Sequence, residues 1–188
     1  MIDEPAAPLS RADRERRNGH LGRVIWFTGL SGAGKSTLAT SLEMELHRRG
    51  IHTYLLDGDE LRRGLNSDLG FSVSDRSENI RRTAEVARLL MDAGLVVITA
   101  LISPFRRERE LARERIGRER FTEVYVNTSL EVCEQRDVKG LYKRARAGLL
   151  PDMTGIGSPY EPPVDPTYVA DAGTRTVEAI VQELAALV

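Results

Sequence analysis

The chain has 188 residues, a length that fits one domain with its own hydrophobic core. Its 27 lysines and arginines nearly balance its 28 aspartates and glutamates, so no overall basic field favours non-specific binding of nucleic acid or of an anionic membrane. The single cysteine, Cys133, excludes an internal disulfide, and no apolar run is long enough for a membrane span. Residues 1–20 are charged where a secretory signal would need an apolar run, so we expect a cytoplasmic protein.

The first elements along the chain can be predicted from their residue types. Residues 1–20 carry mixed charges typical of a solvated tail or a surface helix, and residues 21–188 are expected to form the domain. A β-branched and aromatic run at residues 23–29 predicts a buried parallel strand. A glycine-rich turn follows it, and then residues 35–49 show helical spacing of apolar side chains before Gly50.

Strands and helices then alternate to the end of the chain. We predict strands at residues 52–56, 95–100, 121–126 and 168–170. Helices are expected at residues 75–92, from Pro104, and at residues 130–136, 139–146 and 174–187, with a Pro/Gly-rich loop at residues 148–166. Strands separated by helices pair in parallel through right-handed crossovers, so the pattern predicts a three-layer α/β domain with a five-stranded parallel sheet.

The glycine-rich turn fits the phosphate-loop pattern G-x-x-x-x-G-K-[ST]. It lies directly after a predicted strand and at a predicted helix start, which is the context that phosphate binding requires. Backbone N–H groups of such a loop surround phosphate oxygens, Lys35 reaches the β- and γ-phosphates, and Ser36 offers a hydroxyl to Mg²⁺. The predicted ATP-binding residues here are Gly29, Leu30, Ser31, Gly32, Ala33, Gly34, Lys35, Ser36 and Thr37.

A phosphate loop alone does not separate GTPases, motor ATPases and metabolite kinases. No Asn-Lys-x-Asp string for guanine recognition is present, which disfavours a GTPase. The strand at residues 95–100 contains no acidic residue, so the usual Walker-B carboxylate of a motor ATPase is missing. A metabolite kinase remains.

Two carboxylates follow the second predicted strand, in Leu56-Asp57-Gly58-Asp59. They fall at the carboxyl edge of the sheet, where α/β proteins bind ligands. Asp59 is the predicted base that accepts the proton of an acceptor hydroxyl, and Asp57 is predicted to support the metal or the turn. In isolation, the same string would be interpreted as a turn and a helix cap.

Further strings resemble the adenylylsulfate kinase family over nearly the whole chain after His20. They are Gly64-Leu65-Asn66, Asp75-Arg76-Ser77-Glu78-Asn79, Ile102-Ser103-Pro104-Phe105-Arg106, Lys139-Gly140-Leu141-Tyr142, Thr154-Gly155-Ile156 and Pro159-Tyr160-Glu161. The resemblance implies a P-loop kinase fold with a lid segment, a homodimer, MgATP as donor and adenosine 5′-phosphosulfate as acceptor. The implied reaction transfers the γ-phosphate to the ribose 3′-hydroxyl and gives 3′-phosphoadenosine 5′-phosphosulfate, and association with a sulfurylase is a further possibility.

The resemblance also implies roles for individual residues. Phe71 would stack on the acceptor adenine, Met153 would lie opposite it where the family commonly has phenylalanine, and Arg136 would lie against the ATP adenine. Gly157, where an acidic residue is common, would add backbone freedom. The remaining acceptor-binding residues implied are Asp59, Arg62, Asn66, Arg76, Asn79, Ile102, Ser103, Arg106, Ile156 and the lid residues Lys139, Gly140 and Leu141.

Ser103 is a candidate catalytic residue with Lys35 and Asp59, because such kinases have been described with a phosphoserine at the matching position. The sequence beside it supplies no evident base, and a cap for a helix opening with Pro104 is the structural interpretation. The stretch from Arg106 to Glu110 is predicted to face solvent, apart from Arg106. Two other functions stay open: a kinase for a different small metabolite, and a nucleotide-binding regulatory subunit without turnover.

Overall fold

Residues 8–188 are described by the structure, a computed structural model. Five strands form one parallel sheet in the order β2-β3-β1-β4-β5. Their bounds are β1 Arg23–Thr28, β2 Thr53–Asp57, β3 Val96–Ala100, β4 Phe121–Val126 and β5 Tyr168–Ala170. The predicted parallel five-stranded α/β fold is confirmed, and each strand lies within one residue of its predicted limits.

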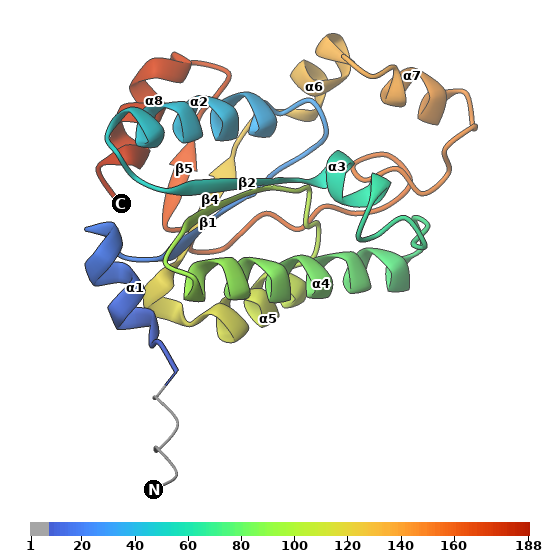
Figure 1. The fold of residues 1–188 in the computed structure, drawn as a ribbon. Helices are drawn as coiled ribbons and strands as arrows, with labels where there is room; N and C mark the ends of the chain where they lie inside the picture. The colour runs from blue at the N-terminus through green and yellow to red at the C-terminus, as the bar shows by residue number, and fades with distance from the viewer. Residues whose placement is uncertain (1–7) are drawn as a thin grey trace, which may run out of the picture.

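Helices cover both faces of the sheet (Figure 1). α2 and α8 lie on one face, α4 and α5 lie on the other, and α1 packs near one end of α4. The bounds are α1 Arg11–Asn18, α2 Lys35–Arg48, α3 Gly58–Arg63, α4 Val73–Asp92, α5 Arg106–Ile116, α6 Leu130–Arg136, α7 Leu141–Arg146 and α8 Val177–Ala185, with a 3-10 turn at Arg118–Arg120.

Two apolar clusters, one on each side of the sheet, hold these layers together. Successive residues of a strand point to opposite faces, so β1 contributes Ile25 and Phe27 to the α2/α8 side and Val24 and Trp26 to the α4/α5 side. All four side chains are buried, as predicted for a central parallel strand. The core thereby fixes the carboxyl ends of β1, β2 and β3, where the candidate site lies.

The N-terminal segment that was expected to be a solvated tail or surface helix contains α1. Ser10 caps this helix and accepts a hydrogen bond from the Asp13 N–H. Glu15 is buried and accepts hydrogen bonds from the Gly22 N–H at 2.9 Å and from Arg120 at 3.1 Å. Residues 1–7 lie outside the described residues, and no helix in the described part has the length and apolar character needed to cross a bilayer.

Helix starts on the acceptor side differ from the predictions. α5 begins at Arg106 rather than Pro104, and its cap position is Phe105, so the interpretation of Ser103 as a helix cap is wrong. The prediction of a solvent-facing helix after Arg106 is also wrong in part, because Glu108 and Arg109 are buried. α3 is an additional short helix, with Asp57 as its cap.

Candidate active site

The phosphate loop connects β1 to α2 at the carboxyl edge of the sheet (Figure 1). Gly29 has a φ of 149°, and a Cβ at this position would lie 2.7 Å from the Val126 carbonyl oxygen. Gly34 has a φ of 109° at the first turn of α2. These positions require glycine because larger residues rarely adopt such backbone angles. The loop therefore has the backbone conformation of an anion-binding turn at a helix N-terminus.

Lys35 lies folded along the phosphate loop. Its Nζ donates hydrogen bonds to the Gly29 and Leu30 carbonyl oxygens at 3.0 and 2.7 Å. The side chain is buried, and burial lowers the pKa of its ammonium group from 10.5 to about 8. Opposite charges on Asp57 and Asp59 counteract this shift in part. Among residues 8–188 no carboxylate is in hydrogen-bond contact with this cation, which is therefore held beside the loop in a position to pair with phosphate.

A pH dependence of ATP binding follows from this pKa. Phosphate oxygens favour the charged form of Lys35, so ATP raises its pKa, and binding above pH 8 takes up a proton. We expect ATP affinity to fall between pH 8 and pH 9.5, by at most about tenfold per pH unit. Calorimetric titrations in buffers of different ionisation enthalpy measure both the affinity and the proton uptake. Lys35→Met should bind weakly without this uptake, whereas equal wild-type affinity at both pH values would contradict the expectation.

Ser36, Asp57 and Asp59 meet beside the loop. The Ser36 hydroxyl donates to Asp57 Oδ2 at 3.0 Å, and Asp57 Oδ1 accepts from the Asp59 N–H at 2.9 Å. Asp59 forms an ion pair with Lys139, and more than half of each side chain is exposed. The two predicted metal-supporting residues are therefore adjacent, and the predicted base lies between them and the predicted lid.

Three of the predicted acceptor-binding side chains gather at α3 and the start of α4. The guanidinium of Arg62 lies over the Phe71 ring at 4.4 Å, and its Nη1 donates to the Gly70 carbonyl at 2.8 Å. Arg76 donates to the Phe71 carbonyl at 2.9 Å. It also donates to the Asp152 carbonyl and the Thr154 hydroxyl, which lie in the loop after α7. Phe71 itself is 64% exposed, so an aromatic face is available to a planar ligand.

Asn66 and Asn79, two more of the predicted acceptor-binding residues, form a buried pair. Asn66 Nδ2 donates to Asn79 Oδ1 at 2.9 Å, which joins the segment after α3 to α4. Asn66 Oδ1 is buried and accepts no hydrogen bond from the described residues. An unpaired buried carbonyl costs free energy, so this oxygen is suited to a hydroxyl or amine donor.

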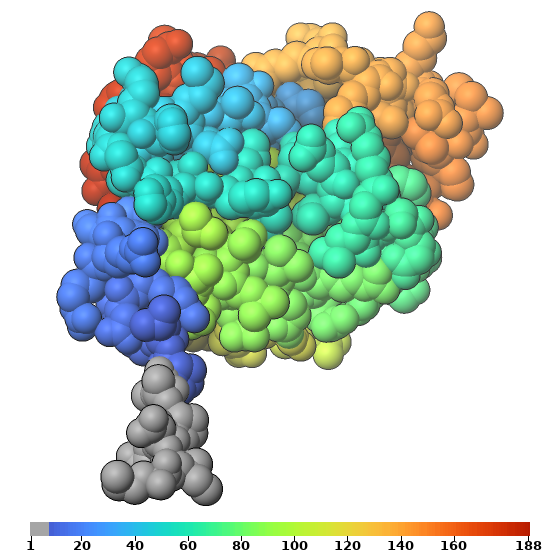
Figure 2. Space-filling view, in the orientation of Figure 1, coloured from blue at the N-terminus to red at the C-terminus, as the bar shows by residue number. Residues whose placement is uncertain are grey.

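The segment that contains the predicted lid residues Lys139, Gly140 and Leu141, and Arg136 just before them, packs against the phosphate loop. Arg136 donates to the Gly32, Ala33 and Ala172 carbonyls at 3.3 to 3.4 Å. The Asp137 carboxylate accepts from two N–H groups at the start of α7, and the Tyr142 hydroxyl donates to the Ser31 carbonyl at 2.9 Å. In the space-filling view the surface around α7 lies close to that of α3, in agreement with the Lys139–Asp59 ion pair (Figure 2).

Ile102 and Ser103 form a tight bend after β3. Ser103 has a φ of 39°, an uncommon angle for a residue other than glycine. Its hydroxyl accepts a hydrogen bond from the Trp26 indole at 3.1 Å, and the residue is buried. Arg109 contacts this bend from α5, and no local sequence pattern marks it, because its partners lie in segments far apart along the chain.

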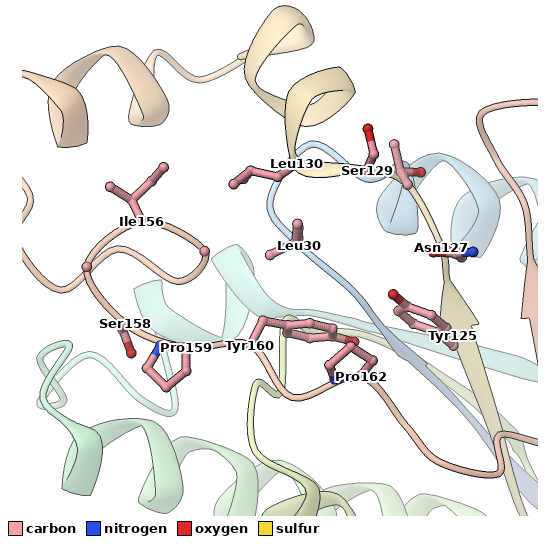
Figure 3. Close-up of a pocket in the computed structure, with 13 residues that line it drawn as sticks. Leu30, Tyr125, Asn127, Ser129, Leu130, Ile156, Ser158, Pro159, Tyr160 and Pro162 are labelled. Carbon is pink, nitrogen blue, oxygen red and sulfur yellow. The ribbon is translucent and has the colours of Figure 1, made fainter.

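Met153 and Ile156 lie in the loop before Pro159-Tyr160-Glu161, and Arg106 lies beside that loop at the start of α5. Met153 is buried in the α2/α8-side cluster, and Arg106 donates to the Pro162 carbonyl at 2.7 Å. Ile156 lines a cavity of about 490 Å³ beside Leu30 (Figure 3). None of the other predicted acceptor-binding residues lines it, so this cavity is separate from the cluster of Arg62, Phe71 and Arg76, called the Arg62 group below.

Gly157 has a steric role that the sequence did not reveal. A Cβ at this position would lie 1.6 Å from the Pro151 carbonyl oxygen. The N–H groups of Ile156, Gly157 and Ser158 all donate to the Met153 carbonyl. This compact turn requires glycine for its close backbone approach, so added backbone freedom is an incomplete account of Gly157.

Comparisons with known proteins identify the family. The family model described as adenylylsulphate kinase matches residues 21–171. The chain belongs to the adenylylsulphate kinase family. The adenylyl-sulfate kinase of Klebsiella pneumoniae (strain MGH 78578) is 59% identical over 179 residues, covering 95% of this chain and 89% of the relative. A probable adenylyl-sulfate kinase of Halalkalibacterium halodurans is 57% identical over 174 residues, covering 93% and 84%.

A solved structure extends the comparison to three dimensions. The Mycobacterium tuberculosis APS kinase CysC in complex with AMPPNP and APS has a TM-score of 0.85 and 47% identity, covering 89% of this chain and 97% of that one. The predicted family is confirmed, and with it the predicted class of enzyme, a kinase with an alcohol acceptor.

Proposed function

We propose that this adenylylsulphate kinase transfers the γ-phosphate of MgATP to the ribose 3′-hydroxyl of adenosine 5′-phosphosulfate through the residues described above. The observation that carries the assignment is the position of Asp59. Asp59 lies two residues after the end of β2, in the first turn of α3. Its N–H donates to Asp57, which also accepts from the Ser36 hydroxyl, and its carboxylate contacts lid residue Lys139. A base at this place can face both a nucleotide on the phosphate loop and an acceptor beside α3.

In the proposed mechanism the phosphate loop and Lys35 bind the β- and γ-phosphates. Lys35 exchanges its contacts with the Gly29 and Leu30 carbonyls for phosphate oxygens and stabilises the charge that develops during transfer. Asp59 leaves Lys139, accepts the proton of the acceptor hydroxyl, and orients that oxygen toward the γ-phosphate. Lys139 is then free to contact an anionic group of the acceptor.

Ser36 and Asp57 are the proposed magnesium-supporting residues. A hydroxyl and a carboxylate oxygen 3.0 Å apart match the oxygen ligands and ordered waters that Mg²⁺ prefers. When bound, Mg²⁺ would neutralise charge on the β- and γ-phosphates. Residues 8–188 contain no group of three or more His, Cys, Asp or Glu side chains placed to hold a metal ion.

Recognition of the acceptor is assigned to the Arg62 group. Burial lowers the pKa of both Arg62 and Arg76, yet arginine stays charged, so each presents a partly desolvated cation to a phosphate or sulfate. Phe71 provides an exposed ring for the adenine, and the buried Asn66–Asn79 pair holds the segment after α3 against α4 beside it. Ile102, Ser103 and the lid residues Gly140 and Leu141 complete the proposed acceptor site.

Met153 offers a test of the acceptor adenine site. Met153→Phe adds a flat ring where the proposal places the second face of the adenine. We expect the KM for adenosine 5′-phosphosulfate to fall by up to about tenfold, since a base–aromatic stack is worth about 1–3 kcal/mol. The KM for ATP should stay within about twofold. Steady-state kinetics with each substrate varied measure both values, and equal effects on the two would remove Met153 from the acceptor site.

A coupled assay tests the function itself. ADP formation from MgATP should require adenosine 5′-phosphosulfate, and the product should carry the new phosphate on the ribose 3′-oxygen. Nucleoside monophosphates and sugars serve as control acceptors. Turnover with one of these at a higher kcat/KM would assign a different metabolite, and no turnover with any acceptor would favour a regulatory protein.

The assembly and location of the protein are further parts of the proposal. We propose a homodimer, as the family resemblance implies, working in the cytoplasm and open to association with a sulfurylase. Light scattering at several protein concentrations should give twice the mass of the 20.9 kDa chain. A monomer that retains full activity would contradict a required dimer.

A further inference from the structure

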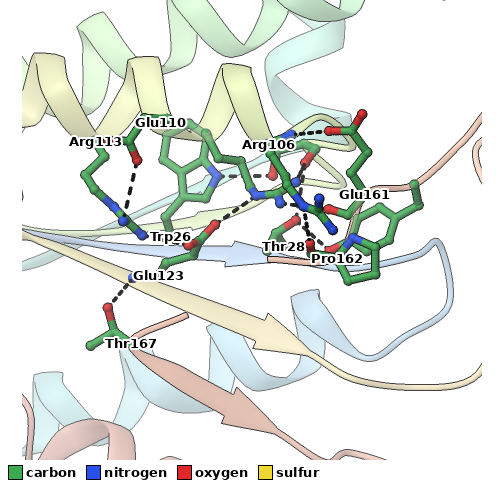
Figure 4. A network of polar contacts seen from close by, with 12 residues as sticks. Trp26, Thr28, Arg106, Glu110, Arg113, Glu123, Glu161, Pro162 and Thr167 are labelled. Atoms are coloured by element: carbon green, nitrogen blue, oxygen red, sulfur yellow. Dashed lines mark hydrogen bonds and ion pairs between the residues drawn. The ribbon is translucent and has the colours of Figure 1, made fainter. Parts of the chain in front are cut away.

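Arg109 is a buried arginine on α5, outside the proposed substrate contacts. It is 2% exposed, and its guanidinium contacts three separate segments of the chain. Nη1 donates to the Ser103 carbonyl at 2.7 Å, Nη2 to the Glu161 carbonyl at 2.8 Å, and Nε to Glu123 Oε1 at 2.8 Å. The network around these groups is drawn in Figure 4. Only the planar, five-donor guanidinium can make these contacts at once.

The Ser103 bend is held from β1 as well. The Thr28 hydroxyl donates to the Ile102 carbonyl at 2.7 Å, and because it has one proton it accepts from the Tyr160 hydroxyl at 3.0 Å. The Gly29 N–H, the first of the phosphate loop, lies 3.5 Å from the same Ile102 carbonyl. The bend therefore contacts the junction between β1 and the phosphate loop directly.

The outer side of the bend is joined to the Tyr160–Glu161 segment. The Glu161 N–H donates to the Pro104 carbonyl at 2.8 Å, and the Glu161 carboxylate accepts from the Arg106 N–H at 2.8 Å. The Arg109 guanidinium lies 5.9 Å from the centre of the Tyr160 ring. Arg109 thus occupies the point where the bend, the outer segment and β4 meet.

We propose that Arg109 is a positioning residue that sets the Ser103 bend relative to the phosphate loop. This rests on the proposed function, in which Ile102 and Ser103 contact the acceptor. The backbone at Ser103 has a left-handed φ that an unheld serine would leave, and Arg109 holds its carbonyl in that conformation. Phosphoryl transfer depends on alignment of the acceptor oxygen with the γ-phosphate, so a displaced bend lowers kcat while ATP binding is retained.

Arg109→Lys tests this proposal, with Arg113→Lys as its matched control. A lysine can keep the ion pair with Glu123 but cannot reach the Ser103 and Glu161 carbonyls together. Arg113 lies one turn further along α5 and also binds Glu123, through Oε2 at 2.7 Å, but has no hydrogen bond to the bend. We expect kcat to fall at least about tenfold in Arg109→Lys, with the KM for ATP within about twofold. Arg113→Lys should keep kcat within about twofold.

The fluorescence of Trp26 detects a change in the Ser103 bend without depending on catalytic activity. Trp26 is the only tryptophan of the chain, and its indole donates to the Ser103 hydroxyl. Arg109→Lys should change the emission spectrum of Trp26, whereas Arg113→Lys should leave it as in the wild type. Circular dichroism measures the folded fraction of each variant, and each kcat is calculated per folded molecule. If Arg109→Lys does not fold, Glu123→Gln weakens the same anchor and should lower kcat severalfold with a similar change in emission.

Three outcomes would overturn the proposal. These are a folded Arg109→Lys protein with wild-type kcat, equal losses in both arginine variants, and a loss of kcat without any change in Trp26 emission. They are distinguishable from failure of the proposed function, because in that case the wild-type protein itself does not phosphorylate adenosine 5′-phosphosulfate.

Discussion

Lys35→Ala is expected to lower kcat by at least about 10³-fold while the protein stays folded. The hydrogen bonds of the Lys35 ammonium group to the Gly29 and Leu30 carbonyls place this cation at the phosphate loop. Burial disfavours its charge, as the pKa of about 8 indicates, so its removal relieves a desolvation cost. The loss should therefore appear in turnover and ATP affinity and not in stability.

The measurement combines single-turnover kinetics with thermal unfolding. Lys143→Ala is a matched control because Lys143 lies on α7 and its hydrogen bonds with residues 8–188 involve its backbone N–H and carbonyl, not its side chain. This control should keep kcat within about twofold. A Lys35→Ala protein that unfolds at room temperature would assign Lys35 a structural role, and one that retains turnover would place the phosphates elsewhere.

The sheet and the phosphate loop could be predicted because their signals are local. The run from Arg23 to Thr28 is apolar on both faces, and Lys35 follows a glycine-rich turn at fixed spacing. Each pattern needs only a few neighbouring residues to specify its conformation. The Asp57 and Asp59 positions follow from the same logic, since the end of a parallel strand fixes the edge at which they lie.

The surroundings of Ser103 could not be predicted because they depend on contacts between distant segments. Proline after Ser103 suggested a helix start, but the bend instead takes its shape from Trp26, Thr28 and Arg109. In the sequence Arg109 is one arginine within a charged helix, and its burial becomes evident only when Glu123 is placed opposite it. Long-range pairing of this kind leaves no periodic signal in a single sequence.

The contacts of the lid segment could be predicted only in part, because they too join distant residues. Lys139 was assigned to a lid by resemblance, but its ion pair with Asp59 joins residues 80 positions apart. Asp137 caps α7 with its carboxylate while adopting a φ of 23°, a combination that depends on the turn before the helix. The Lys139–Asp59 ion pair is exposed and contributes roughly 0 to 1 kcal/mol to stability, so substrates can replace it readily.

Asp59→Asn separates the proposed base from the metal-supporting residues. Asparagine keeps the shape of the side chain but cannot accept a proton from the acceptor hydroxyl, so kcat should fall by at least about 10²-fold. Ser36 and Asp57 keep their hydrogen bond at 3.0 Å, so the affinity for MgATP should stay within about twofold of the wild type. Rapid-quench measurement of the first turnover gives the transfer rate, and calorimetry gives the MgATP affinity.

Two control variants show whether this loss belongs to the base. Glu60→Gln removes the neighbouring exposed carboxylate of α3 and should keep kcat within about twofold. Lys139→Gln removes the same ion pair as Asp59→Asn, but it should mainly raise the KM for the acceptor, because the base remains. If Asp59→Asn and Lys139→Gln lose kcat equally, the ion pair and not proton transfer is what the reaction requires. An unchanged kcat in Asp59→Asn would exclude Asp59 as the base, since no general-base role survives replacement of a carboxylate by an amide.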